Sequence, residues 1–315
     1  MPAFKEVHMP LWMTVSIPAV LLLAWFLYIT RHGREIDSKG AYNRLQRGWR
    51  RIAFWAGDVC ILGHFPWVTW DKHGYRVSVE EMLEVMAQMR AGDVLLTRHE
   101  AYPLSNLAIP GCFKHAAFVS RGPVVFGESH RDVRAAKLIE AVSEGVMCWS
   151  PLRARADRMI LLRPKNMEGG DIARAVFAAQ KAVGCDYDAD FQFNIEEELE
   201  AANKPKAVTG VVGDVAAELK VTVENIKAEF DMAFSCTEAV AFAWWHKRAE
   251  LRLFRRPSRG RNVIVADQFV NNGFAVVWTN VTSAEVAKAG MHEEGVGLIE
   301  QYWKSEAEVE PATSK

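Results

Sequence analysis

An uncharged, strongly apolar segment near the N-terminus constrains this chain more than any other feature. Residues 9–30 read MPLWMTVSIPAVLLLAWFLYIT and contain no charged side chain. The hydrocarbon core of a bilayer is crossed by a helix of about 20 apolar residues. We therefore expect one transmembrane helix over 9–30, preceded by a short tail, 1–8. A cleaved signal peptide fits less well, because the apolar run is longer than a usual h-region and no small-residue cleavage site follows it.

The charges on the two sides of this segment predict its orientation. Lys5 precedes it, opposed by Glu6, whereas lysines and arginines crowd the residues that follow it, 31–51. Such an excess marks the cytoplasmic side, so we expect a single-pass membrane protein with its soluble part in the cytoplasm. Residues 31–77 form a basic, tryptophan-rich juxtamembrane segment. Its helical pattern over 38–56 fits either an anionic membrane surface or a helix packed on the domain.

The composition of the chain and the motifs that it lacks argue against several classes of function. The formal net charge of −1 argues against a nucleic-acid partner. Five cysteines without a CxxC pair argue against a disulfide framework and suit a reducing compartment. The chain has no P-loop, HExxH, GxSxG or GxGxxG motif, so no cofactor is expected. Cys112 and His115 have C-x-x-H spacing, but a zinc site needs two further ligands that the sequence does not offer, so no metal is expected.

The residues after 77 predict an α+β domain. A Ser78/Glu81 capping box opens a helix that ends before Ala91, and a second helix is expected over 171–183. Short apolar runs with turn residues between them predict antiparallel strands at 93–97, 115–120, 123–127, 137–142, 146–149, 158–164, 262–266 and 274–278. We place the catalytic domain at 78–280, with an insertion at 194–231. A C-terminal helix and an acidic tail follow over 281–315, with the residues after Trp303 expected to be disordered.

A cysteine stands at the start of a predicted buried helix. In FSCTEAVAFAWW, residues 234–245, Ser235 and Glu238 form a second capping-box pattern, which makes Cys236 the first helical residue. The positive end of a helix favours the thiolate, which is the nucleophilic form of cysteine, although Glu238 opposes this effect. The alternative is that Cys236 is a small buried hydrophobic residue, as most cysteines are.

Strand alternation supplies two partners for this thiol. In KHAAFVS, His115 shares a face with Ala117 and Val119, so a helix could approach closely there; in KLIEAV, Glu140 interrupts an apolar face. A buried carboxylate needs a partner, and a histidine on a neighbouring strand could provide one. Cys236 as nucleophile, His115 as general base and Glu140 as the group that orients the imidazole would form a thiol-hydrolase site. The simpler interpretations are a hydrogen-bonded core histidine and a Glu140 that pairs with an arginine.

These segments, taken in order, resemble a known family. GDVLLTR, KHAAFVS, LIEAV, CDYD and FSCTEAV are similar to the circularly permuted, NlpC-type branch of the papain-like superfamily, the YiiX/YebB-like group related to lecithin retinol acyltransferases, over residues 92–270. The resemblance implies a permuted papain-like fold with its antiparallel sheet packed against the cysteine helix. It implies Cys236 as nucleophile, His115 as base and Glu140 as third member, with Tyr187 approaching the substrate. The segment 194–231 is longer than the family pattern, and residues 1–90 have no counterpart in it.

The sequence therefore predicts a membrane-anchored cysteine hydrolase or acyltransferase that acts through an acyl-cysteine intermediate on an amide, ester or thioester. Its expected partners are the lipid bilayer and an acyl-lipid, lipidated protein or peptide substrate. If the domain lay outside the cytoplasm, a cell-wall peptide amidase or peptidase would become the better interpretation. A non-catalytic module that binds a lipid or acyl chain is the other alternative.

Overall fold

The computed structural model describes residues 75–101, 106, 109, 111–126, 130–142, 145–187, 233–254, 256–258 and 261–309, together with residues 60–61 and 68–69. The chain divides into two compact units, Met1–Asp58 and Val59–Lys315, and every described residue belongs to the second. The predicted segments 1–8, 9–30 and 194–231 and most of 31–77 lie outside the described residues. Among the residues that are described, no helix is long and apolar enough to span a bilayer.

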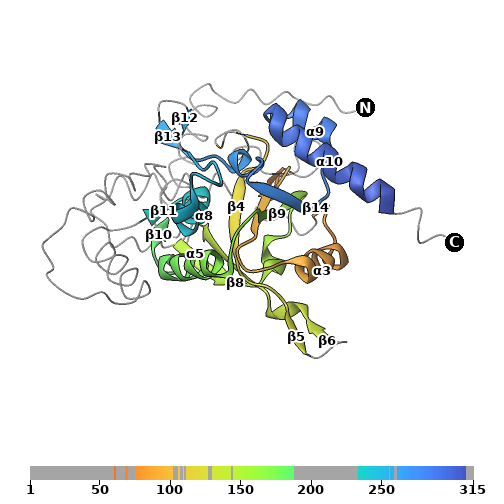
Figure 1. Ribbon diagram of the computed structural model, residues 1–315. Coiled ribbons are helices and arrows are strands. Elements are labelled where there is room, and N and C mark those ends of the chain that lie inside the picture. Colours follow the sequence, from red (N-terminus) through yellow and green to blue (C-terminus); the bar gives the residue numbers. More distant parts are fainter. Residues whose placement is uncertain are drawn as a thin grey trace, which may run out of the picture. The chain divides into compact units, whose positions relative to one another are not determined.

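A six-stranded antiparallel sheet forms the centre of the second unit, as the strand pattern predicted, and helices cover it in an α+β arrangement (Figure 1). Its strands pair in the order β14-β9-β3-β4-β7-β8. Their bounds are β3 Val94–Arg98, β4 His115–Arg121, β7 Lys137–Val142, β8 Gly145–Trp149, β9 Arg158–Pro164 and β14 Phe274–Thr279. The neighbouring strands β4 and β7 thus carry His115 and Glu140, and β8 lies on the other side of β7.

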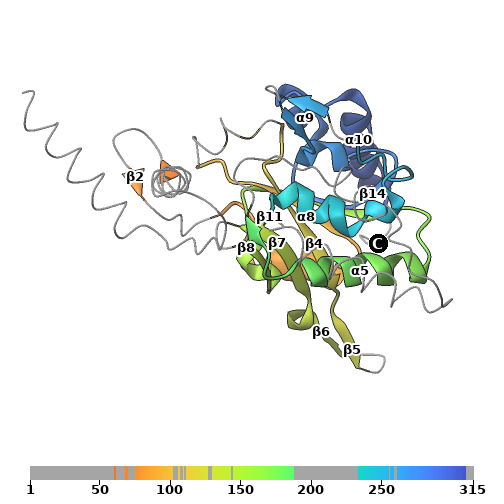
Figure 2. The same cartoon turned by 90° about the vertical axis from the view of Figure 1, so that its left-hand side faces the viewer.

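Helices lie on both faces of this sheet and bury a separate hydrophobic cluster on each. On one face, α3 (Val79–Gln88) packs its Met82 and Met86 against Ala117 and Val119 of β4. On the other, α5 (Gly169–Ala182) and α8 (Cys236–Ala243) pack against the alternate residues of the same strand. Figure 2 shows α8 crossing in front of β4 and β7. The helix that approaches the face of Ala117 and Val119 is therefore α3, while the cysteine helix covers the opposite face.

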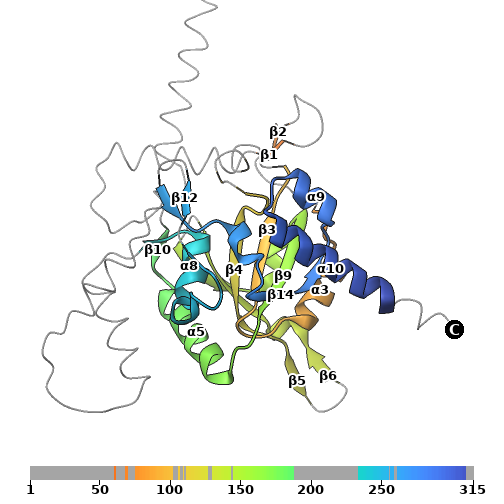
Figure 3. The ribbon, with the colours of Figure 1, turned by 45° about the horizontal axis from the view of Figure 1, so that its top comes forward.

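Of the two C-terminal helices, the second contacts β14 and the first packs against the second (Figure 3). They are α9 (Ser283–Lys288) and α10 (Glu293–Val309), so the expected C-terminal helix is present. Our expectation of disorder after Trp303 is wrong for residues 304–309, which continue α10. The i,i+4 ion pair of Lys304 with Glu300 supports this last part of the helix.

Short elements connect and flank this framework. Two-stranded pairs join β1 to β2, β5 to β6, β10 to β11 and β12 to β13; their bounds are Cys60–Ile61, Val68–Thr69, Val124–Phe126, His130–Asp132, Asp186–Tyr187, Ala233–Phe234, Arg256–Ser258 and Arg261–Val263. The 3-10 turns are η1 Val133–Ala135, η2 Pro151–Ala154, η3 Trp245–Lys247 and η4 Ala266–Phe269. The parallel pair β10/β11 bears on the site, because it joins the CDYD segment to the residues just before the cysteine helix.

Candidate active site

Cys236 is the first residue of α8, as the capping-box pattern predicted. Ser235 is the extended N-cap residue, and its backbone N–H donates to Glu238 Oε2 at 2.8 Å. The Cys236 side chain is buried, with 4 % of its surface exposed, and its Sγ lies 4.0 Å from the carbonyl oxygen of Lys114. The thiol therefore meets the backbone immediately before His115, at the helix end where unpaired N–H groups favour negative charge.

His115 and Glu140 contact each other across the strand pair β4/β7. His115 Nε2 lies 2.5 Å from Glu140 Oε2, and the two side chains are 25 % and 5 % exposed. A histidine on the neighbouring strand is thus the partner that the buried carboxylate requires, and an arginine is not needed. The side chain of Cys236 is also among the groups that act on the His115 imidazole. Being the first residue of β4, it lies at the strand end that the N-terminus of α8 approaches.

The contacts of His115 assign a role to each ring nitrogen. Glu140 Oε2 accepts a hydrogen bond from the Nε2–H of His115. Nδ1 is therefore the ring nitrogen that remains for the Cys236 sulfur. Burial disfavours the imidazolium form, but the charges of Cys236 and Glu140 and the hydrogen bonds to both raise the pKa of His115 well above its ordinary value. The arrangement therefore favours a protonated imidazole beside the Cys236 side chain.

Glu140 has a further donor that sequence reasoning missed. The indole N–H of Trp149, the last residue of β8, donates to Glu140 Oε1. Burial alone would raise the pKa of Glu140, but the charge and hydrogen bond of His115, the indole and the nearby charge of His99 bring it below its ordinary value. A hairpin that pairs β8 with β7 could have been expected from the sequence, but the direction of the tryptophan ring could not.

Asp267 anchors the turn that leads into His115 and was also missed. Its carboxylate accepts the backbone N–H of Cys112 at 2.5 Å and that of Phe113 at 2.8 Å. Arg98 Nη1 donates to the carbonyl oxygen of Cys112 at 3.4 Å, so the same turn is also tied to the end of β3. The two hydrogen bonds of Asp267 join segments that are far apart in sequence, and no local sequence motif predicts them. They fix the point at which β4 begins.

We expect Gly111→Ala to destabilise the protein by about 2–3 kcal/mol, because a Cβ there would meet the Asp267 carboxyl at 2.9 Å and the backbone has φ +97°. Gly184→Ala is the matched control, since Gly184 has φ +86° but open space around it, and should cost about 1 kcal/mol. Urea unfolding of both variants measures the difference. Equal losses would contradict the proposed role of Asp267.

The His115–Glu140 pair predicts a bell-shaped dependence of stability on pH. The lowered pKa of Glu140 gives stabilisation that is present above its unfolded value of 4.5 and is lost as the pH falls through the folded value. The raised pKa of His115 gives stabilisation that is complete below 6.5 and is lost as the pH rises through the folded value. The free energy of unfolding of wild type minus that of Glu140→Gln should therefore be largest between pH 4.5 and 6.5. A difference that is constant with pH would refute the coupling.

Tyr187 lies next to the segment that leads into the cysteine helix. It pairs with Phe234 in the parallel β10/β11 ladder, two residues before Cys236, and its half-buried side chain packs against the same hydrophobic cluster as α8. The CDYD segment and the cysteine segment are thus brought together. The structure places Tyr187 near the start of α8 through its backbone, and a substrate contact stays a prediction.

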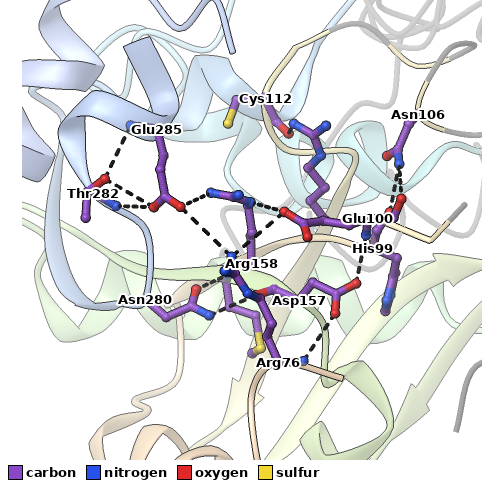
Figure 4. A network of polar contacts seen from close by, with 12 residues as sticks. Arg76, His99, Glu100, Asn106, Cys112, Asp157, Arg158, Asn280, Thr282 and Glu285 are labelled. Atoms are coloured by element: carbon purple, nitrogen blue, oxygen red, sulfur yellow. Dashed lines mark hydrogen bonds and ion pairs between the residues drawn. The ribbon is translucent and has the colours of Figure 1, made fainter. Parts of the chain in front are cut away.

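A network of ion pairs stabilises the neighbouring ends of β3 and β9 (Figure 4). Arg158 pairs with Glu100 at 2.5 Å and with Glu285 of α9 at 2.8 Å. Asp157 accepts the backbone N–H groups of Arg76 and Glu100. These groups satisfy one another and hold α9 against the sheet, so we interpret this network as structural. In the described part of the chain, no group of three or more histidine, cysteine or acidic side chains could hold a metal ion.

Comparisons with known proteins provide no relative for this chain: no family model matches it, and no curated protein or solved structure is significantly similar to it.

Proposed function

We propose that this protein is a cysteine hydrolase or acyltransferase that cleaves or transfers an acyl group through an acyl-Cys236 intermediate. One observation carries the proposal: the thiol at the N-terminus of α8 lies against the backbone of Lys114, next to a histidine whose Nε2 is held by a buried carboxylate. A nucleophile, a base and a group that orients the base are the elements of covalent acyl transfer. With Nε2 engaged by Glu140, Nδ1 is the ring nitrogen left to serve the nearby thiol.

The chemistry follows from these contacts. The Cys236 sulfur attacks the acyl carbonyl carbon, and a carbon–sulfur bond forms as the carbonyl becomes an oxyanion. Backbone N–H groups at the start of α8, including that of Cys236, are suitable donors to this oxyanion. As the intermediate collapses, the bond to the leaving amine, alcohol or thiol breaks, and His115 Nδ1–H supplies its proton.

The same nitrogen then serves the second half of the reaction. Neutral Nδ1 removes a proton from water, which attacks the thioester and releases the acid and Cys236. In a transferase, an acceptor amine or alcohol replaces the water. Glu140 keeps the proton on Nε2 throughout, so that Nδ1 faces the sulfur.

The order of the elements is consistent with the permuted papain-like fold that the sequence resembles. The histidine strand β4 precedes the cysteine helix α8 in the chain, and the α8 helix packs against the antiparallel sheet. The third polar group, Glu140, comes from the strand beside the histidine. We propose this fold family on that arrangement together with the quoted motifs.

Sequence features suggest where the substrate comes from. The apolar segment 9–30 and the basic residues after it support a membrane-anchored enzyme on the cytoplasmic side, so we propose an acyl-lipid or a lipidated protein as substrate. A topology reporter fused to the C-terminus tests this location. If the reporter were active on the outer side of the membrane, a cell-wall peptide would replace the acyl-lipid or lipidated protein as the proposed substrate.

Trapping the intermediate tests the proposed reaction. Full-length protein in detergent is mixed with p-nitrophenyl esters of two-, eight- and sixteen-carbon acids, quenched in acid and digested for mass spectrometry. We expect the acyl mass on the peptide that contains Cys236, and its absence in Cys236→Ala. Cys148→Ala removes an exposed cysteine from β8 and should leave the adduct unchanged. Reversible binding of the esters without any adduct would favour the non-catalytic acyl-binding module.

A further inference from the structure

Glu140 is held on both of its oxygens, each by a donor from a different strand. His115 on β4 takes Oε2, and Trp149 on β8 donates its indole N–H to Oε1. The sheet order β4-β7-β8 places the carboxylate between the two donors. In the β7/β8 register Glu140 faces Met147 and Leu138 faces Trp149, so the indole reaches Glu140 diagonally on the same face.

The chemistry of the two donors restricts the state of the carboxyl group. An indole N–H can only donate, so Oε1 must accept. A proton on Glu140 Oε1 would point at the indole hydrogen of Trp149. A proton on Oε2 would take the place of the hydrogen that His115 Nε2 donates. The pair of donors therefore favours the ionised carboxylate in one orientation. With 5 % of its side chain exposed, Glu140 has little water to replace a lost donor.

The ring of Trp149 is itself fixed in place. The guanidinium of Arg153, in η2, lies 4.6 Å from the ring centre. The turn η2 begins at the N-cap Ser150 and packs against α3. Trp149 is thus clamped between its strand and a turn that contacts a core helix.

We propose that Trp149 is a positioning residue that keeps Glu140 ionised and directed at His115, and that it thereby sets the lowest pH at which Cys236 remains reactive. The inference rests on the proposed function, because it concerns the same thiol. Besides His115, His99 is a titratable group that acts on Glu140, and Cys236 acts on His115 in turn. Loss of the indole donor would let Glu140 take up a proton at higher pH, and His115 would then lose the partner that stabilises its charged form.

The test is the pH profile of Cys236 alkylation by limiting iodoacetamide in the full-length protein, read by mass mapping between pH 4 and 9. We expect Trp149→Phe, which keeps the ring but loses the N–H, to move the acid limb up by about one pH unit. Its rate at pH 8 should stay within about threefold of wild type. Trp303→Phe is the matched control. Trp303 lies in α10, and its indole N–H donates to the carbonyl oxygen of Val281, so losing this donor should not move the acid limb of the profile.

The possible results separate the two proposals. If Cys236 of the wild-type protein is not labelled in preference to the other cysteines, the proposed function fails and this inference fails with it. If instead Cys236 of the wild-type protein is labelled preferentially, Trp149→Phe can keep the wild-type acid limb or be alkylated more slowly by the same factor at every pH. Either result overturns only the role of Trp149. Should Trp149→Phe not fold, Arg153→Met decides: an upward shift of about 0.3 unit or more supports the role of Trp149, and an unchanged limb overturns it.

Discussion

Replacing Cys236 with alanine is expected to abolish acyl transfer, with a loss of at least about 10³-fold in kcat/KM on any ester that the wild-type protein turns over. The sulfur is the atom that forms the covalent bond, and no neighbouring group can replace it. The free energy of unfolding should change by less than about 1.5 kcal/mol, since a small buried side chain is exchanged for a slightly smaller one. Ester hydrolysis and urea unfolding of the same preparation measure both quantities.

Cys148→Ala serves as the control for this experiment, because it removes a thiol that is exposed on β8. Its activity should equal that of wild type. A Cys236→Ala protein that is folded and retains more than a tenth of the activity would rule out the acyl-cysteine intermediate.

Replacing His115 with alanine is expected to lower kcat/KM by about 10²- to 10⁴-fold, the usual contribution of a general acid–base. The imidazole both accepts the thiol proton and returns it to the leaving group, so its loss affects acylation and deacylation. It also leaves Glu140 buried without its charged partner, and the variant should be measurably less stable. Burst and steady-state phases of ester cleavage separate the two half-reactions.

His246→Ala is the histidine control. That residue stacks on Trp244, beyond the C-terminal end of α8, and has no part in the proposed chemistry. Equal activity losses in the two variants would indicate that His115 acts through stability, and an unchanged His115→Ala enzyme would remove it from the mechanism.

Much of the sheet could be predicted because its strands have simple local patterns. The runs at 137–142 and 158–164 have the bounds that were expected, and β4 differs by one residue at its end. The start of the cysteine helix was also correct, since a capping box depends on residues only three apart. Alternation and the need to pair a buried carboxylate made the contact between His115 and Glu140 one candidate beside an arginine partner, and the structure shows the contact with His115.

The groups that were missed depend on three-dimensional contacts. Trp149 reaches Glu140 through a diagonal relation in a hairpin, which requires the register of β7 and β8. Asp267 holds the turn before β4 from more than 150 residues away. The pairing of CDYD with the segment before Cys236 is likewise a parallel ladder between distant residues. Sequence patterns report the neighbours along the chain, and these contacts arise only when the sheet is assembled.

The most direct test of the account is which cysteine of the full-length protein reacts first with limiting iodoacetamide at about pH 6. Exposure alone favours Cys148, which is exposed, over Cys236, which is 4 % exposed. Burial and the charge of Asp267 raise the pKa of Cys112 to about 11, so that thiol stays protonated. An ordinary thiol has a pKa near 8.5 and is almost unreactive at this pH. The account predicts that Cys236 is labelled first and that His115→Ala abolishes this preference, whereas labelling of Cys148 ahead of Cys236 would contradict it.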